Sequence, residues 1–342
     1  MNLRKRNNNI DFLRGIAALC IVIIHTAFWS GESYLPKWFI NLTLFVDVPV
    51  FIFISGLTYQ YNSSILKSIK GVINIWKKWL IFILLFVVIL LITKYQVSFD
   101  EIVPWLFFSF KKPTTLPVVP GSIWYIPMYI KVLLISGIII ILNKKYGEDD
   151  KSIKNIIMFF MLIFGIAKYQ KISMILDELT IFYSMFFMIG YYAINNKIDG
   201  KKLTKYLFIN ILLTIIIMKL YGANISSLQN FKFPPDLPYF FFSMNSILIF
   251  WYLKDKLNIT ENNIINKLGK NALFCYFSQG IGSSIIIMIA SKINITAPIK
   301  FILLLMINLS ITLALTLILC VIEKLLKIIV EKRCKHGQEN DK

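Results

Sequence analysis

Charge is scarce in this chain. Asp, Glu, Lys and Arg make up 16% of the 342 residues, compared with about 25% in soluble globular domains. Hydrophobic residues reach 57%, and mean hydropathy is +0.68. No Pro-rich, Gly-rich or Ser-rich tract interrupts the apolar runs. A water-soluble globular enzyme is therefore nearly excluded, and so is a disordered chain, because the apolar surface is too large to stay in water.

Cysteine and histidine are also rare. The four cysteines, Cys20, Cys275, Cys320 and Cys334, form no CxxC motif and no Cys/His ligand spacing, so we expect neither a disulfide scaffold nor a metal site. The two histidines are His25, in the first apolar run, and His336, in a basic tail where we expect it to be solvated. Candidates for a neutral general base are correspondingly few.

The apolar runs have the length that a membrane-spanning helix needs, about 20 residues. We predict helices at 11–30, 38–58, 76–94, 122–142, 155–169, 179–195, 205–222, 238–253, 271–291 and 298–327. The predicted fold is all-α: a polytopic integral membrane protein with about ten transmembrane helices, forming a single domain over residues 1–342.

The distribution of basic residues predicts the orientation. If the N-terminus is cytoplasmic, the inner segments hold 25 Lys and Arg and the outer segments hold 10. The positive-inside rule then places the basic segment 1–10 and the tail 328–342 in the cytoplasm. Topology also explains the net charge of +19, so we expect contact with membrane lipids and no nucleic-acid partner.

Four ionisable residues that lie deep inside predicted spans matter here: Arg14, His25, Asp47 and Lys131. Burying a charge in a membrane costs roughly 2.5–3.5 kcal/mol on insertion scales, so each needs a partner or a function. Arg14 and His25 are eleven residues apart, which places them about 20° apart around the helix and ~16.5 Å apart along it. We interpret them as two ends of a lined path, with a cation at the inner mouth and a titratable base deeper in. The alternative for His25 is a hydrogen-bonded residue that only packs helices.

Asp47 and Lys131 each lie nine residues from the outer end of a predicted helix, at matching depth. One interpretation is a buried Asp47–Lys131 ion pair that holds two helices in register. The other is that one of them shares a polar site with His25. Both interpretations stay open at this level.

Several segments resemble, in order, the signature blocks of the acyltransferase-3 family of membrane O-acyltransferases. The first block runs from Ile10 to His25 and contains an R-x10-H element formed by Arg14 and His25. The other blocks are Val48-Pro-Val-Phe-Ile-Phe-Ile-Ser-Gly56, Trp124-Tyr125, Phe186-Phe-Met-Ile-Gly-Tyr191 and Leu268-Gly-Lys-Asn-Ala-Leu-Phe-Cys-Tyr276. The resemblance covers residues 10 to about 280.

The resemblance implies transfer of an acyl group, usually acetyl from cytoplasmic acetyl-CoA, to a hydroxyl of a cell-surface polysaccharide or its lipid-linked precursor. His25 and Arg14 would be catalytic, with no metal required. The acyl-CoA phosphates would bind to Arg14 and to lysines that stand where the family often has arginines: Lys67, Lys70, Lys77 and Lys78. The carbohydrate acceptor would contact Trp124 and Tyr125, with Asp47 and Lys131 nearby, unless the aromatic pair belongs to an interfacial belt. Such an enzyme would work in a bacterial cell membrane beside polysaccharide-synthesis proteins.

Two departures from the family pattern bear on the site. Gln279 stands where the last block often has a histidine, which removes a possible second base. The lysines offer point charges in place of bidentate guanidinium groups.

Two other functions compete with this one. A transporter or flippase for a glycan or small anion would use His25, Asp47 and Lys131 as a proton relay. A non-catalytic assembly protein would keep the fold and lack activity.

Overall fold

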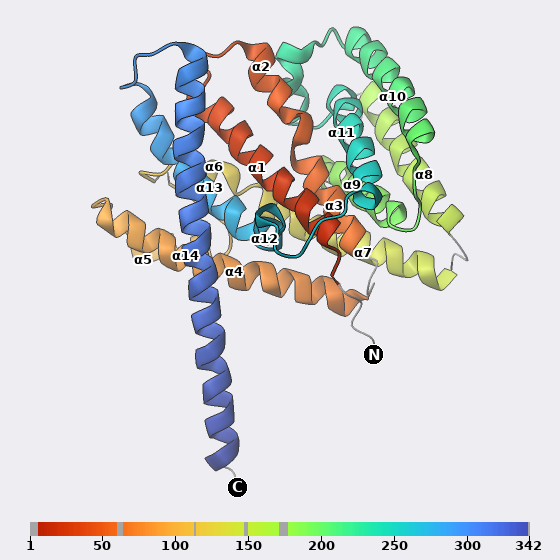
Figure 1. Ribbon diagram of the computed structural model, residues 1–342. Helices are drawn as coiled ribbons and strands as arrows, with labels where there is room; N and C mark the ends of the chain where they lie inside the picture. Colours follow the sequence, from red (N-terminus) through yellow and green to blue (C-terminus); the bar gives the residue numbers. More distant parts are fainter. Residues whose placement is uncertain (1–5, 60–63, 113, 147–149, 171–176, 341–342) are drawn as a thin grey trace. The chain divides into compact units, whose positions relative to one another are not determined.

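The computed structural model describes residues 6–59, 64–112, 114–146, 150–170 and 177–340. Within these ranges every regular element is a helix (Figure 1), which confirms the all-α prediction. Seven helical segments of the described chain are long and apolar enough to cross a membrane: Asn8–Ser30, Lys37–Tyr59, Ile65–Ile92, Val118–Tyr146, Gly200–Leu220, Ala272–Ala290 and Ala297–Glu331.

The other three predicted spans also coincide with helices. These are α8 (Asp150–Tyr169), α9 (Glu178–Ala193) and α11 (Leu237–Lys256). They are not among the seven segments that meet the length and hydropathy requirements of a span. The count of about ten membrane crossings and the cytoplasmic position of both termini therefore remain predictions.

The chain divides into two compact units, 1–72 with 124–270 and 73–123 with 271–342. The first contains α1 (Asn8–Ser30), α2 (Lys37–Leu42), η1 (Thr43–Val46), α3 (Val48–Tyr59), α7 (Tyr125–Tyr146), α8, α9, α10 (Gly200–Leu220), η3 (Ile225–Phe231), α11 and α12 (Ile264–Lys270). The second contains α5 (Phe99–Leu106), α6 (Val118–Ser122), α13 (Ala272–Ala290) and α14 (Ala297–Asn340). Helix α4 (Ile65–Ile92) contributes to both.

Close helix crossings hold the first unit together. At Gly56 on α3, an added Cβ would lie 2.0 Å from the carbonyl oxygen of Phe187 on α9, and at Gly190 on α9 it would lie 2.0 Å from that of Phe53. Gly15 on α1 and Gly269 on α12 form a second crossing of the same kind. Small residues let helix backbones approach closely where lipid supplies no hydrophobic drive for association.

The second unit combines aromatic and polar packing. The indole Nε1 of Trp79 on α4 donates to the carbonyl of Trp105 on α5, at 2.7 Å, and its ring contacts Phe82, Phe108 and Phe277. Between α13 and α14, Asn308 donates to Ser283 at 3.1 Å. Polar contacts of this kind hold membrane helices together.

The predicted helix 38–58 is broken at Asp47. Helix α2 leads into η1, Asp47 is extended, with φ −119° and ψ −163°, and α3 begins at Val48. The physical reason is Pro49, which lacks a backbone N–H and fits only the first turn of a helix. The break turns Asp47 from a mid-helix residue into one that precedes a helix start.

The predicted helix 122–142 is interrupted as well. Helix α6 ends at Ser122 and α7 begins at Tyr125. Pro127 cannot donate to the carbonyl of Ile123, so a helix that includes it has to start close by. The interruption places Trp124 and Tyr125 at the start of α7.

The segment between the predicted helices 38–58 and 76–94 is largely helical. Helix α4 begins at Ile65, eleven residues before the predicted start, and Ser64 accepts a hydrogen bond from the backbone of Lys67. All four lysines predicted to bind the donor lie on α4.

Candidate active site along the first helix

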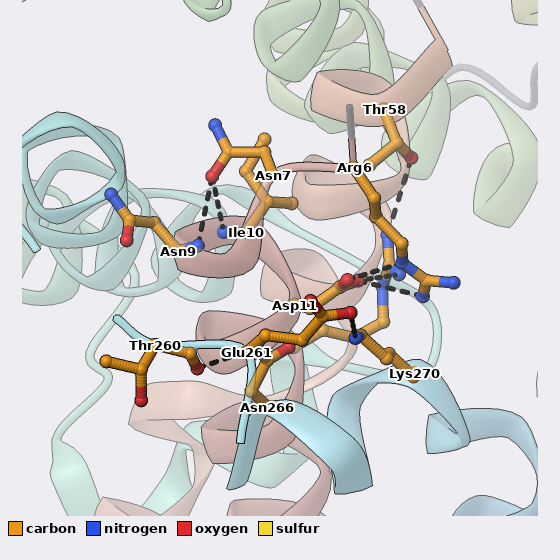
Figure 2. Close-up of polar contacts among 11 residues, drawn as sticks. Arg6, Asn7, Asn9, Ile10, Asp11, Thr58, Thr260, Glu261, Asn266 and Lys270 are labelled. Carbon is orange, nitrogen blue, oxygen red and sulfur yellow. Dashed lines mark hydrogen bonds and ion pairs between the residues drawn. The ribbon is translucent and has the colours of Figure 1, made fainter. Parts of the chain in front are cut away.

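Three charged groups form a cluster at the N-terminal end of α1. The carboxylate of Asp11 is buried and accepts hydrogen bonds from both Arg6 and Arg14. Figure 2 shows Arg6 beside Asp11. Arg14 donates from Nη1 to Asp11, at 3.1 Å, and from Nη2 to the hydroxyl of Thr58 at the end of α3, at 3.4 Å. The planar guanidinium is thus held by two partners at once.

Lys67 reaches the same end of α3. Its Nζ donates to the carbonyl oxygens of Thr58 and Tyr59, at 3.0 and 2.9 Å, and lies 5.1 Å from the ring centroid of Tyr59. A cation is favourable there because the last carbonyls of a helix are unpaired and carry partial negative charge. Arg14 and Lys67 therefore converge on one helix terminus.

The other three predicted donor lysines differ in their surroundings. Lys70 and Lys77 are exposed on α4. Lys78, in the second unit, pairs with Glu323 at 3.5 Å and lies over the ring of Phe274. Of the four, Lys67 is the one that the structure brings to the helix terminus contacted by Arg14.

Aromatic residues of α7 lie next to Arg14. Tyr125 and Tyr129 stack with centroids 5.6 Å apart and an interplanar angle of 8°, and both lie near Arg14. Trp124 meets Tyr125 edge-on at 6.4 Å. The two predicted acceptor residues thus join a row of rings that begins beside Arg14.

At the far end of this row lies a buried ion pair. The Nζ of Lys232 is 2.6 Å from Oδ2 of Asp47, and the hydroxyl of Tyr239 donates to the same oxygen at 2.6 Å. The side chains of Lys232 and Asp47 are 8% and 2% exposed. The Lys232 ammonium also lies 5.7 and 5.4 Å from the ring centroids of Trp124 and Phe233, within the range of cation–π attraction.

His25 lies beside this ion pair. It interacts electrostatically with both Lys232 and Asp47. Its Nδ1 is buried and makes no hydrogen bond to any described part of the chain. The helix-packing alternative, which required a hydrogen-bonded imidazole, gains no support from this nitrogen. A nitrogen without a hydrogen-bond partner in a polar site suits a proton acceptor.

The predicted Asp47–Lys131 pair is wrong. Lys131 is 3.0 Å from Asp177, which precedes α9, and its side chain is 56% exposed. Partial burial raises the pKa of Asp177, but hydrogen bonds from Lys131 and Thr180 outweigh burial and hold it below its ordinary value. The prediction failed because the equal depth of Asp47 and Lys131 along their helices does not determine which faces of those helices are in contact. The proton relay of the transporter alternative therefore lacks its lysine.

Sequence reasoning missed the true partners of Asp47. Lys232 and Phe233 lie in a predicted loop, and Tyr239 lies among many apolar positions of α11. The segment Phe231-Lys-Phe-Pro-Pro-Asp offered one signal, since a lysine between two aromatic residues ahead of a proline pair is unusual for a solvated loop. Asn41 holds η3, which leads into this segment: its Nδ2 donates to the carbonyl of Ser226, at 3.1 Å, and its Oδ1 accepts from the backbone N–H of Gln229, at 2.7 Å.

Comparison with known proteins identifies the family of the chain. No significant match was found among curated proteins or among solved structures. The model of the acyltransferase-3 family, described as an acyltransferase domain, matches residues 7–322, a range that contains Arg14, His25 and Lys232. The chain, with its several apolar helices, therefore belongs to the acyltransferase-3 family of membrane acyltransferases.

Proposed function

We propose that the protein moves an acyl group, acetyl in the first instance, from cytoplasmic acetyl-CoA to a hydroxyl of a cell-surface polysaccharide or its lipid-linked precursor in a bacterial cell membrane. One observation carries the proposal: the uninterrupted helix α1 presents Arg14, held by Asp11 and Thr58, and eleven residues later His25, beside a buried ion pair. An anion site and a base on one helix match the two ends of an acyl-CoA.

The inner end supplies the donor site. Arg14 and Lys67 meet at the end of α3, and Lys70 is exposed on α4. Guanidinium and ammonium groups both recognise phosphate, the first through a bidentate fork. The extended pantetheine arm is comparable to four or five peptide units, about 15 Å, which is close to the predicted separation of Arg14 and His25, about 16.5 Å.

His25 supplies the base. As a neutral imidazole it accepts the proton of the acceptor hydroxyl, whose oxygen forms a bond to the thioester carbonyl carbon. The carbon–sulfur bond then breaks, and the CoA thiolate takes the proton from His25. No covalent acyl-enzyme is required. Trp124 and Tyr125, at the start of α7, would contact the acceptor sugar.

Membrane vesicles from producing cells test the proposal, because they carry the cells' own glycan acceptors. With acetyl-CoA labelled in the acetyl group, the wild-type protein should transfer alkali-labile label to glycan. His25→Ala should insert normally and transfer none. Nuclear magnetic resonance of the surface polysaccharide, with and without the protein, identifies the acylated hydroxyl. Equal transfer by His25→Ala and wild type would remove His25 from the reaction.

A further inference from the structure

Lys232 is a buried cation that has no role in the reaction proposed above. It follows η3, in the segment between α10 and α11, and its side chain is 8% exposed. Its surroundings are the carboxylate of Asp47, the rings of Trp124 and Phe233, and His25. The ammonium group is thus next to the base and to a predicted acceptor residue.

Stability alone does not explain this arrangement. Desolvating both charges of a buried ion pair costs about as much as their attraction returns, so well-packed apolar residues are often equally stabilising. A chain with only 16% charged residues nevertheless keeps a lysine here. Buried charges in a membrane protein mark functional sites more often than structural ones.

Lys232 has unused hydrogen-bonding capacity. An ammonium group carries three N–H donors, and one carboxylate oxygen, Oδ2 of Asp47, is its hydrogen-bonding partner within the described part of the chain. The rings of Trp124 and Phe233 stabilise the charge but accept no conventional hydrogen bond. Donors therefore remain for an oxygen that is not part of the protein.

The neighbouring hydroxyl groups point to the same conclusion. The hydroxyl of Tyr183 is fully buried near Asp47 and Tyr239, and it makes no hydrogen bond of normal geometry to any described residue. Its ring centroid is 6.3 Å from that of Trp124. Buried polar atoms without partners are uncommon and call for a ligand or a catalytic role. Together with Nδ1 of His25, they mark where a polar ligand would sit.

We propose that Lys232 is a catalytic residue that stabilises the oxyanion formed during acyl transfer, and that Asp47 and Tyr239 are positioning residues for it. This inference rests on the proposed acyltransferase function. When the acceptor oxygen bonds to the carbonyl carbon, the carbonyl electron pair moves onto oxygen, and the hydroxyl proton moves to His25. The oxyanion faces the Lys232 ammonium until the pair returns, the carbon–sulfur bond breaks and the thiolate takes the proton.

Replacement of Lys232 by Met tests the role, because Met keeps the length of the side chain and removes its charge. Removal of one oxyanion donor typically lowers kcat by a factor of about 10²–10³. We expect a loss of that size for Lys232→Met in the vesicle assay, with the KM for acetyl-CoA changed less than about threefold, because the donor phosphates bind elsewhere. Lys232→Arg, which keeps the charge, should recover part of kcat.

Lys232→Met leaves the carboxylate of Asp47 buried without its cation, which could destabilise the fold. A double variant that removes both charges is therefore needed. Asp47→Asn with Lys232→Met carries no unpaired charge, should match wild type in thermal unfolding in detergent, and should be as inactive as Lys232→Met. Lys168→Met is the matched control, since Lys168 also pairs with a carboxylate, Glu178, and lies over a ring, Phe164, away from the site. Its kcat should equal that of wild type.

The outcomes separate the two proposals. A wild-type protein that transfers no label contradicts the proposed function itself. A wild-type protein that transfers label, together with a folded double variant that keeps half or more of kcat, overturns the role of Lys232 and leaves the proposed function standing. A rise in KM without a fall in kcat also overturns it, because Lys232 would then only bind substrate.

Discussion

The ammonium of Lys232 and the carboxylate of Asp47 are joined across 2.6 Å, although they lie far apart in the sequence. Asp47 marks the break before α3, and Lys232 follows η3. Their contact connects the segment between α10 and α11 to the start of α3, beside His25. The pair therefore determines what faces the only histidine among the predicted spans.

Removing the charge of Lys232 should destabilise the protein far more than removing the charge of Lys131. Breaking a buried pair typically costs about 3–5 kcal/mol, and an exposed pair is worth about 0–1 kcal/mol. We expect Lys232→Met to lower the thermal unfolding temperature in detergent strongly, and Lys131→Met to leave it nearly unchanged.

A second change at Asp47 identifies its partner. Asp47→Asn should restore the stability of Lys232→Met and should not interact with Lys131→Met, since residues without shared contacts have additive effects. Coupling between positions 47 and 131 would revive the ion pair that the structure rejects.

Gly56, at the crossing of α3 and α9, should not tolerate replacement by a residue with a side chain. Gly56→Ala places a methyl group 2.0 Å from the backbone oxygen of Phe187, too close for any small adjustment. We expect little folded protein by size-exclusion chromatography in detergent. Gly165→Ala on α8 is the control, because an added Cβ there meets nothing within 4 Å. It should be neutral or stabilise by up to about 1 kcal/mol through helix propensity. Equal tolerance at both positions would refute the tight crossing.

Arg14→Lys should weaken use of the donor. Lysine cannot contact Asp11 and Thr58 through a planar fork, and a hydrogen bond to a charged group is worth about 1.5–3 kcal/mol. We expect the KM for acetyl-CoA to rise about tenfold or more, with kcat changed far less. Arg6→Lys should have a smaller effect, because the side chain of Arg6 is 55% exposed and pairs with Asp11 within the described part of the chain. An unchanged KM for Arg14→Lys would exclude Arg14 from donor binding.

Asn41→Ala should lower kcat from a distance. Asn41 bonds the backbone at Ser226 and Gln229, in the helix that leads into Lys232. Since small displacements of catalytic groups cost much of their effect, we expect kcat to fall about tenfold at constant KM for acetyl-CoA. Asn224→Ala, which removes the exposed cap of the same helix, is the control and should act less. If both variants lowered kcat equally, the effect would reflect loss of η3 rather than placement of Lys232.

Much of the fold followed from hydropathy, because membrane helices satisfy their own backbone and need long apolar runs. Each of the ten predicted segments coincides with helical structure. The errors occurred where local chemistry overrode hydropathy. Pro49 and Pro127 break two predicted helices, and the polar segment from Ile65 onward is helical, although its charges resembled those of a loop.

Arg14 and His25 could be placed from the sequence because both lie on one helix, whose regular rise and rotation fix their separation. Asp11 joined them for the same reason, three residues before Arg14. The sequence also carried the family motifs, whose glycines at 15, 56, 190 and 269 are the points of close helix crossing.

The partners of His25 depended on tertiary structure. Hydropathy reports how deep a residue lies but not which neighbour its side chain faces, so Asp47 and Lys131 looked matched while Lys232 went unnoticed. The sequence by itself determined the helices, the family and the two ends of α1, because these depend on local spacing and composition. Only the folded chain decided that Lys232, Tyr239 and Asp47 meet beside His25, because that contact joins segments far apart in the sequence whose relative positions depend on the packing of several helices.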